Sequence, residues 1–168
     1  MKKSVFGIFI ASLALLSCSN DDDSLQKIDQ ILHFYYKNNA GQDVIVPNKI
    51  GSYTNITMND ALAETDNAPV AFALKTTLDS INYIEYLAGA TRKLYSGGES
   101  DDRMYHSQIK VTLTQKLTDS TYSAPINDTL DIYYRWRPSA FEVSKVYYNK
   151  ELKFTKNSQE ANVVTIVK

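Results

Sequence analysis

The alternation of side chains between residues 130 and 137 constrains the fold of this chain more than any other feature. Apolar side chains occupy every second position, at Leu130, Ile132, Tyr134 and Trp136. Because successive side chains of a β-strand point to opposite faces, the pattern predicts a strand with one face in a core. Pro138 cannot donate to a strand ladder, so we expect the strand to end before it.

Other segments share this character and are expected to be further strands. They span residues 28–36, 43–46, 70–78, 81–95, 109–114, 143–148, 151–154 and 163–167. Asn149 and Lys150 separate two of these segments, as in a two-residue hairpin whose asparagine takes the left-handed conformation. Short strands at this spacing predict a mainly-β fold, namely an antiparallel, immunoglobulin-like sandwich of two layers.

Three segments also fit a helix. Ile81, Ile84 and Leu87, between Ser80 and Gly89, suit a short helix as well as strands, and the neighbouring strands favour the latter. Leu25, Ile28, Leu32 and Tyr35 fall at helical spacing behind Ser24, although the aromatic and β-branched run that follows favours a strand. Residues 57–60 have the form of a capping box before residues 61–64, which predicts one or two helical turns. The expected sandwich therefore carries one short helix.

The start of the chain predicts its location. Lys2 and Lys3 precede an apolar run from Val5 to Leu16, which is shorter than the roughly 20 residues of a membrane-spanning helix. This arrangement is typical of a secretory signal helix. Cys18 is the only cysteine of the chain and stands at the cleavage point, without a disulfide partner. We therefore expect a lipoprotein signal peptide at 1–17 and lipid attachment at Cys18.

The remainder divides into an acidic tether at 18–27 and a single β-sandwich domain at 28–168. Loss of Lys2 and Lys3 with the signal leaves 16 basic residues against 19 acidic ones. This mild negative charge without a basic patch argues against a nucleic-acid partner. Apolar residues make up 43% of the chain, which is typical of a globular domain.

Three parts of the sequence resemble lipoproteins of gut and oral Bacteroidetes. Asp21, Asp22 and Asp23 follow Cys18 after Ser19 and Asn20, and acidic residues just behind the cysteine act as a surface-export signal in those lipoproteins. The turn 36–45, with Lys-Asn-x-x-Gly-x-Asp, and the stretch 128–152, with Val-Tyr-Tyr-Asn, resemble small members of this group. The resemblance implies display on the outer face of the outer membrane and a β architecture, and it carries no catalytic residues.

A further resemblance concerns modification. Four triplets match the Asp-Ser/Thr-apolar form that Bacteroidetes use for periplasmic O-glycosylation. Their acceptor residues are Ser24, Ser80, Ser120 and Thr129. The resemblance implies modification at one or more of these positions, provided that the residue is accessible.

Signals for catalysis are weak. His33 and His106 lie far apart, and no Cys/His spacing suits zinc. The nucleophile-elbow and phosphate-binding glycine patterns are absent. Asp101 with Asp102, and Asp128 with Asp131, are the acidic pairs that a fold could turn into a site. We therefore predict no metal and no cofactor.

The expected strand at 130–137 offers the most suggestive surface. Tyr133, Arg135 and Arg137 share the face opposite Trp136, and an aromatic ring with two guanidinium groups can hold a sugar or an acidic ligand. Trp136 itself is expected to anchor the core. The sequence thus predicts a non-catalytic binding or structural module, held to the membrane by the lipid on Cys18, with a glycan or an envelope protein as partner. The alternative is a small hydrolase or ligand-processing enzyme whose carboxylates converge in the fold.

Overall fold

Strands make up all the regular structure that is described. The computed structural model describes residues 25–157 and 160–168. Within these ranges there are eleven strands and no helix. They are β1 (Lys27–Asp29), β2 (Leu32–Lys37), β3 (Tyr53–Asp60), β4 (Ala73–Thr76), β5 (Asn82–Tyr86), β6 (Lys93–Ser96), β7 (Arg103–Gln115), β8 (Ile126–Arg137), β9 (Ala140–Tyr148), β10 (Glu151–Thr155) and β11 (Asn162–Val167). The predicted mainly-β class is confirmed.

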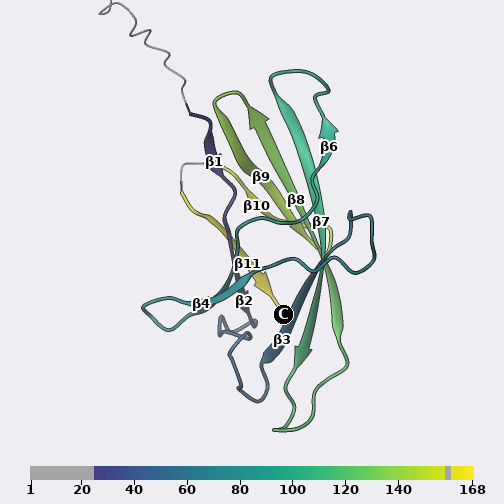
Figure 1. Cartoon of the computed structure of the whole chain (residues 1–168). Helices are drawn as coiled ribbons and strands as arrows, with labels where there is room; N and C mark the ends of the chain where they lie inside the picture. Colours follow the sequence, from purple (N-terminus) through teal and green to yellow (C-terminus); the bar gives the residue numbers. More distant parts are fainter. Residues whose placement is uncertain (1–24, 158–159) are drawn as a thin grey trace, which may run out of the picture.

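The strands form two sheets that pack into a sandwich (Figure 1). The larger sheet has the order β1-β9-β8-β7-β3, with β10 also beside β9 and β6 also beside β7. The smaller sheet has the order β11-β2-β5-β4. Most neighbours are antiparallel as expected, but β1 pairs with β9 and β11 pairs with β2 in parallel. These two pairings join strands that are distant in sequence, which strand periodicity does not reveal.

The core lies between the two sheets. Phe34, Ile84 and Ile166 of the smaller sheet are fully or almost fully buried. They face the large sheet, whose inner side chains include Val111 and Ile132. Alternation along each strand puts these residues on one face, so the period of two seen in the sequence builds the core directly.

The expected short helix is wrong. Residues 57–60 belong to β3 instead, where Met58 is buried and pairs with Val111 of β7. The side chain of Asp60 does not cap a helix. Its Oδ1 accepts a hydrogen bond from the N–H of Leu62 at 2.9 Å, and its Oδ2 accepts one from the N–H of Thr91 at 2.6 Å. Burial of Met58 against the opposite strand outweighs a local signal worth about 1 kcal/mol.

Several expected strands differ in extent. The segment 28–36 is divided between β1 in the large sheet and β2 in the small one. The segment 70–78 is reduced to β4, and Asp43 makes a single bridge with Lys37 in place of a strand at 43–46. β1 begins at Lys27, the last residue of the expected tether.

The predicted hairpin at Asn149 and Lys150 is confirmed. Both residues have positive φ angles, 50° and 68°, which is typical of a two-residue turn between twisted strands. Asn149 also fixes the turn to β8, because its N–H donates to the carbonyl of Thr129 and its Oδ1 accepts from the N–H of the same residue, both at 2.8 Å.

Candidate functional site

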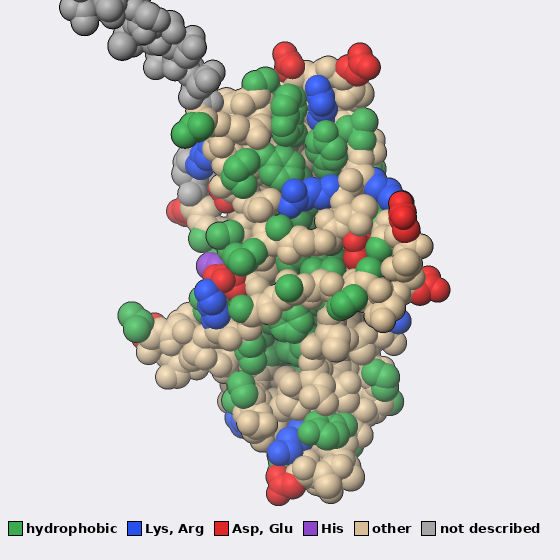
Figure 2. Space-filling view, in the orientation of Figure 1, with side chains coloured by type: hydrophobic (Ala, Val, Ile, Leu, Met, Phe, Trp, Pro, Cys, Tyr) green, Lys and Arg blue, Asp and Glu red, His purple; other side chains and the backbone are tan. Residues whose placement is uncertain are grey.

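The most distinctive surface is the part of the large sheet that extends beyond the small one. In Figure 1, β6 to β9 continue above β2, β4 and β11. Figure 2 shows hydrophobic side chains gathered on this upper part, with Lys or Arg side chains among them. Its principal residues come from the connection before β6 and from five neighbouring strands. We call this surface the shelf, and it comprises Ile28, Arg92, Leu94, Arg103, Tyr105, Trp136 and Phe141.

Strand register places these side chains in two rows on the inner face. Ile28 is opposite Phe141, which is opposite Trp136. In the neighbouring row, Tyr105 is opposite Leu94. Ile28 is 56% exposed and Leu94 is 51% exposed, so the two ends of the shelf are open to solvent although they lie on the side of the sheet that forms the core.

A stacked pair of rings forms the floor of the shelf. The rings of Tyr134 and Phe141 lie 5.4 Å apart and nearly parallel, at 11°. The guanidinium of Arg92 lies over both, 4.7 Å from the first ring centre and 4.9 Å from the second. Burial raises the pKa of the Tyr134 phenol, so this ring stays neutral beneath the cation. Arg92 thus covers both rings of this pair.

Three hydrogen bonds hold Arg92 and the residue before it in place. Its Nη2 donates to Oε1 of Gln30 at 2.7 Å, which links it to the segment between β1 and β2. The preceding residue, Thr91, accepts a 2.7 Å hydrogen bond from the hydroxyl of Ser107 on β7 and donates to the buried Asp60. These hydrogen bonds fix the connection from β5 to β6 on the inner face of the large sheet, and they thereby fix the position of Arg92.

Arg103 covers Trp136 in the same way. Its guanidinium carbon lies 4.5 Å from the centre of the tryptophan ring. Its Nε donates to the carbonyl of Ser100 at 2.7 Å and its Nη2 to that of Glu99 at 3.4 Å, so the loop before β7 orients it. Cation–π contacts of this kind contribute about 0.5–1 kcal/mol at exposed sites. The shelf therefore presents two guanidinium groups, each lying over an aromatic ring.

Trp136 points to the inner face, as predicted, but it is less buried than a core residue. It shares the inner face with Tyr134 and packs against the core. It is nevertheless only partly buried, because this end of β8 lies beyond the small sheet. The interpretation of Trp136 as a core anchor therefore holds in part, and its remaining surface belongs to the shelf.

The residues predicted as a ligand surface lie on the opposite, outer face. Tyr133 stacks on His106 with ring centres 4.7 Å apart, and it meets Tyr95 and Tyr147 edge to face at 5.1 Å and 5.7 Å. Burial is the main cause that raises the pKa of Tyr133, and electrostatic repulsion from Tyr95 and Asp131 raises it further. We call the group Tyr95, His106, Tyr133 and Tyr147 the outer patch.

The two arginines predicted beside Tyr133 are paired with carboxylates. Arg135 binds Asp102 through both Nε and Nη2, and the hydrogen bonds from this guanidinium lower the pKa of Asp102. Arg137 donates to Glu142 at 2.5 Å. Both arginines remain more than a third exposed, so they share the outer face with Tyr133 but are already engaged.

The acidic pair Asp128 and Asp131 does not converge. Three residues apart on β8, the two carboxylates point to opposite faces. Asp131 accepts hydrogen bonds from Nε2 of Gln108 and pairs with Nε2 of His106, each at 2.8 Å, and borders an outer hollow of about 290 Å³. Asp128 is buried and bound by Lys168.

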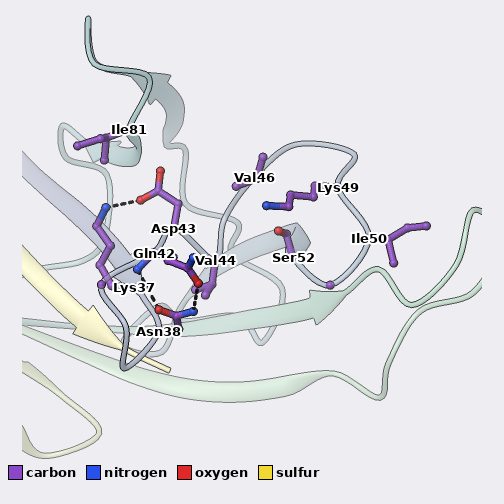
Figure 3. A pocket seen from close by; sticks show the side chains of 12 residues that line it. Lys37, Asn38, Gln42, Asp43, Val44, Val46, Lys49, Ile50, Ser52 and Ile81 are labelled. Atoms are coloured by element: carbon purple, nitrogen blue, oxygen red, sulfur yellow. Dashed lines mark hydrogen bonds and ion pairs between the residues drawn. The ribbon is translucent and has the colours of Figure 1, made fainter.

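A further hollow adjoins the turn that carries the Lys-Asn-x-x-Gly-x-Asp motif. It measures about 500 Å³ and lies between residues 37–46 and 49–52 (Figure 3). Lys37 pairs with Asp43, and Oδ1 of Asn38 accepts hydrogen bonds from the N–H groups of Ala40 and Gln42 at 3.0 and 2.9 Å. Asp43 also accepts the N–H of Asn82 at 2.8 Å. These polar groups hold the turn, and Figure 3 shows them directed at one another.

The two stretches that carry the resemblance meet inside the domain. The Tyr36 hydroxyl donates to that of Tyr148 at 3.4 Å, which donates to Oδ2 of Asp128 at 2.8 Å. Burial raises the pKa of both phenols. Burial also raises the pKa of Asp128, but hydrogen bonds from Asn149, Lys168 and Tyr148 outweigh this effect and leave it below its ordinary value. The motif residues are thus part of the core and its turns.

The remaining predicted sites fall in different environments. Ser80, with φ 61°, and Ser120 are exposed in turns, whereas Thr129 is half-buried within β8. Ser24, Cys18 and the acidic run Asp21–Asp23 lie outside the described residues. Position alone therefore favours the two turn serines as O-glycosylation acceptors.

Comparison with protein-family models, with curated proteins and with solved structures finds no match to this chain. Within residues 25–157 and 160–168, no three His, Cys, Asp or Glu side chains lie together as a metal site would require. The same residues contain no helix long and apolar enough to cross a membrane. The geometry of the shelf and of the outer patch must therefore carry the functional argument.

Sequence reasoning missed the shelf. The period-two pattern assigns Trp136 to the inner face, but it contains no information on where the second sheet ends. The available signal was composition, because Arg103 interrupts the inner-face positions of β7 where a core strand would have an apolar residue.

Proposed function

We propose that this protein is a non-catalytic binding module of the cell envelope, anchored by lipid on Cys18 and displayed on the outer face of the outer membrane. The basic start, the short apolar run and the lone cysteine support the anchor. Asp21–Asp23 support surface display through their resemblance to the export signal of Bacteroidetes lipoproteins.

The location has a direct test in the native organism. Replacement of Cys18 by alanine is expected to move the protein from the membrane fraction to the soluble fraction, because several acyl chains at about 0.8 kcal/mol per buried methylene hold a protein firmly. Protease added to intact cells is expected to degrade the wild-type protein. Full protection of the protein from the protease would refute surface display.

The observation that carries the binding function is the exposure of the shelf. Ile28 and Leu94 are more than half exposed at its ends, and Tyr105 and Trp136 are partly exposed between them. Tryptophan, tyrosine and arginine are also the side chains most often found to dominate binding energies. Exposed apolar surface with polar neighbours is typical of interaction sites.

Binding can be tested with the chain from residue 19 onward, which contains every described residue. Its retention would be measured on immobilised dextran, mannan, pectin and hyaluronan and on outer-membrane proteins. We expect wild type and Tyr133→Ala to be retained on at least one of these ligands, and Trp136→Ala not to be retained on it. Circular dichroism would show that Trp136→Ala is folded. Retention of none, or retention that is insensitive to Trp136, would refute the shelf as the binding site.

The outer patch is a second candidate for the ligand surface. Three tyrosines and a histidine contact one another there beside Asp131, and the adjacent hollow of about 290 Å³ is lined by polar groups. Loss of retention in Tyr133→Ala with retention preserved in Trp136→Ala would select this surface. Release of reducing ends from any of these polysaccharides would instead favour the hydrolase alternative.

A further inference from the structure

The four arginines of the chain fall into two classes. Arg135 and Arg137, on the outer face, are paired with Asp102 and Glu142. Arg92 and Arg103, on the shelf, form no ion pair with any carboxylate in the described ranges of the chain. Arginine is the side chain best suited to bind planar carboxylates, so its presence without an acidic partner on a surface that is otherwise aromatic points to an acidic ligand.

Both shelf arginines retain donors for such a ligand. A guanidinium carries five N–H groups. Arg103 uses two of them on loop carbonyls, and Arg92 uses one on Gln30. Stacking on Trp136 and on Tyr134 with Phe141 fixes each group in orientation, which reduces the entropy lost on binding.

The spacing of these groups suits a linear ligand. Trp136 and Tyr134, over which Arg103 and Arg92 lie, are two residues or about 7 Å apart along β8. The apolar ends of the shelf, Ile28 and Leu94, lie on β1 and β6, four strand spacings or about 19 Å apart. Arg92 lies over the rings of Tyr134 and Phe141, which are 0% and 8% exposed, and Arg103 lies over Trp136. The shelf therefore lacks the continuous apolar centre that a folded protein partner requires.

A sugar acid can contact both the aromatic rings and the guanidinium groups of this surface. Its pyranose ring has an apolar face of C–H groups that packs on the exposed parts of Trp136 and Tyr105, and its carboxylate can accept two parallel hydrogen bonds from one guanidinium. A second copy of this chain is a poor occupant, because two shelves placed face to face would oppose four cations.

We propose that the shelf binds saccharides that carry carboxylates, with hexuronic acids as the ligand class. Arg103 and Arg92 bind the carboxylates of successive or alternate sugars, and a sugar ring packs on the exposed parts of Trp136 and Tyr105. This inference rests on the proposed function and names the ligand class of the same site.

The chain contains a convenient reporter for the test. Trp136 is its only tryptophan, so a change in intrinsic fluorescence on binding reports on the shelf itself. The chain from residue 19 would be titrated with tetragalacturonate, with its fully methyl-esterified form, and with tetraglutamate. We expect tetragalacturonate to change the Trp136 emission saturably, and the ester and the peptide to bind at least about tenfold more weakly.

Matched variants separate a local contact from general charge. Arg103→Gln and Arg92→Gln are each expected to weaken tetragalacturonate binding about tenfold or more. Arg135→Gln removes the same charge beside Trp136 on the outer face, and it is expected to change the affinity by less than about threefold. Unchanged melting temperatures of the three variants would show that each one folds.

The outcomes distinguish a failure of the hexuronate inference from a failure of the proposed binding function. If the methyl ester binds as tightly as tetragalacturonate, or if a neutral polysaccharide binds and is lost in Trp136→Ala, the hexuronate inference is overturned. The proposal of a binding module would still hold. Equal binding of tetraglutamate would replace the saccharide with an acidic peptide. No fluorescence change with tetragalacturonate at millimolar concentration would overturn the inference, while failure of every immobilised ligand would overturn the proposed function itself.

Discussion

The buried ion pair between Asp128 and Lys168 offers the sharpest test of how this sandwich is held together. Asp128 is 5% exposed, and the side chain of Lys168 is 14% exposed. The carboxylate also accepts hydrogen bonds from the Tyr148 hydroxyl at 2.8 Å and from Nδ2 of Asn149 at 2.6 Å. Asp128→Ala would leave a buried ammonium and a buried hydroxyl without their acceptor.

We expect this substitution to lower the free energy of unfolding by about 3–5 kcal/mol, the usual cost of breaking a buried pair by removing one partner. For a domain of this size that corresponds to a melting temperature lower by roughly 6–20 °C. Urea denaturation followed by Trp136 fluorescence measures the change. Because the double variant Asp128→Ala/Lys168→Met removes the unpaired ammonium as well, it should be more stable than the single variant.

The matched control is Asp119, which pairs with Lys116 at 3.2 Å but is 92% exposed. Asp119→Ala should cost less than about 1 kcal/mol, because water already solvates this carboxylate. Equal effects of Asp128→Ala and Asp119→Ala would refute the reasoning, since burial would then play no part. A double variant less stable than Asp128→Ala would show that the unpaired Lys168 is not the source of the loss.

Three further predictions concern acid, a turn and the core. Because the folded pKa of Asp128 is lowered, its stabilising effect is present above the unfolded value of about 3.9 and is lost as pH falls below it; wild type should therefore lose stability below about pH 4, and Asp128→Asn should lose less. Gly97→Ala should destabilise more than Gly41→Ala, because both have positive φ but only at Gly97 would a Cβ collide with backbone, at the Asp102 carbonyl and 2.8 Å from the Arg103 Cα. Equal melting temperatures of these two variants would contradict this. Phe34→Ala should cost about 3–5 kcal/mol in urea denaturation, and Val163→Ala, 44% exposed on the same sheet, about 0.5 kcal/mol or less; a Phe34→Ala loss below about 1 kcal/mol would contradict its place in the core.

Much of the β architecture was predictable because its causes are local. The alternation in β8 assigned Tyr134 and Trp136 to one face and Tyr133 and Arg135 to the other, and the structure has this arrangement. The hairpin at Asn149 followed from the preference of asparagine for positive φ. The capping box at 57–60 failed for the converse reason, since a local preference of about 1 kcal/mol lost to burial of Met58 between the sheets.

The candidate site was predictable only in part. The sequence identified the end of β8 as the place where aromatic rings and guanidinium groups meet. It could not pair Arg135 with Asp102, which is 33 residues away in sequence, or stack Arg103 on Trp136. The sequence therefore located the two arginines that are already neutralised by carboxylates and passed over the two that are not.

The sequence by itself determined which side chains share a face, because the period of two is a property of a single strand. It also determined the hairpin turn at Asn149 and Lys150, because asparagine favours the positive φ that the turn requires. The tertiary structure decided what covers each face, since pairing and layer overlap depend on contacts between segments distant along the chain. The small sheet ends before Trp136, and for this reason a residue whose pattern indicates the core lies on an open shelf beside Arg103.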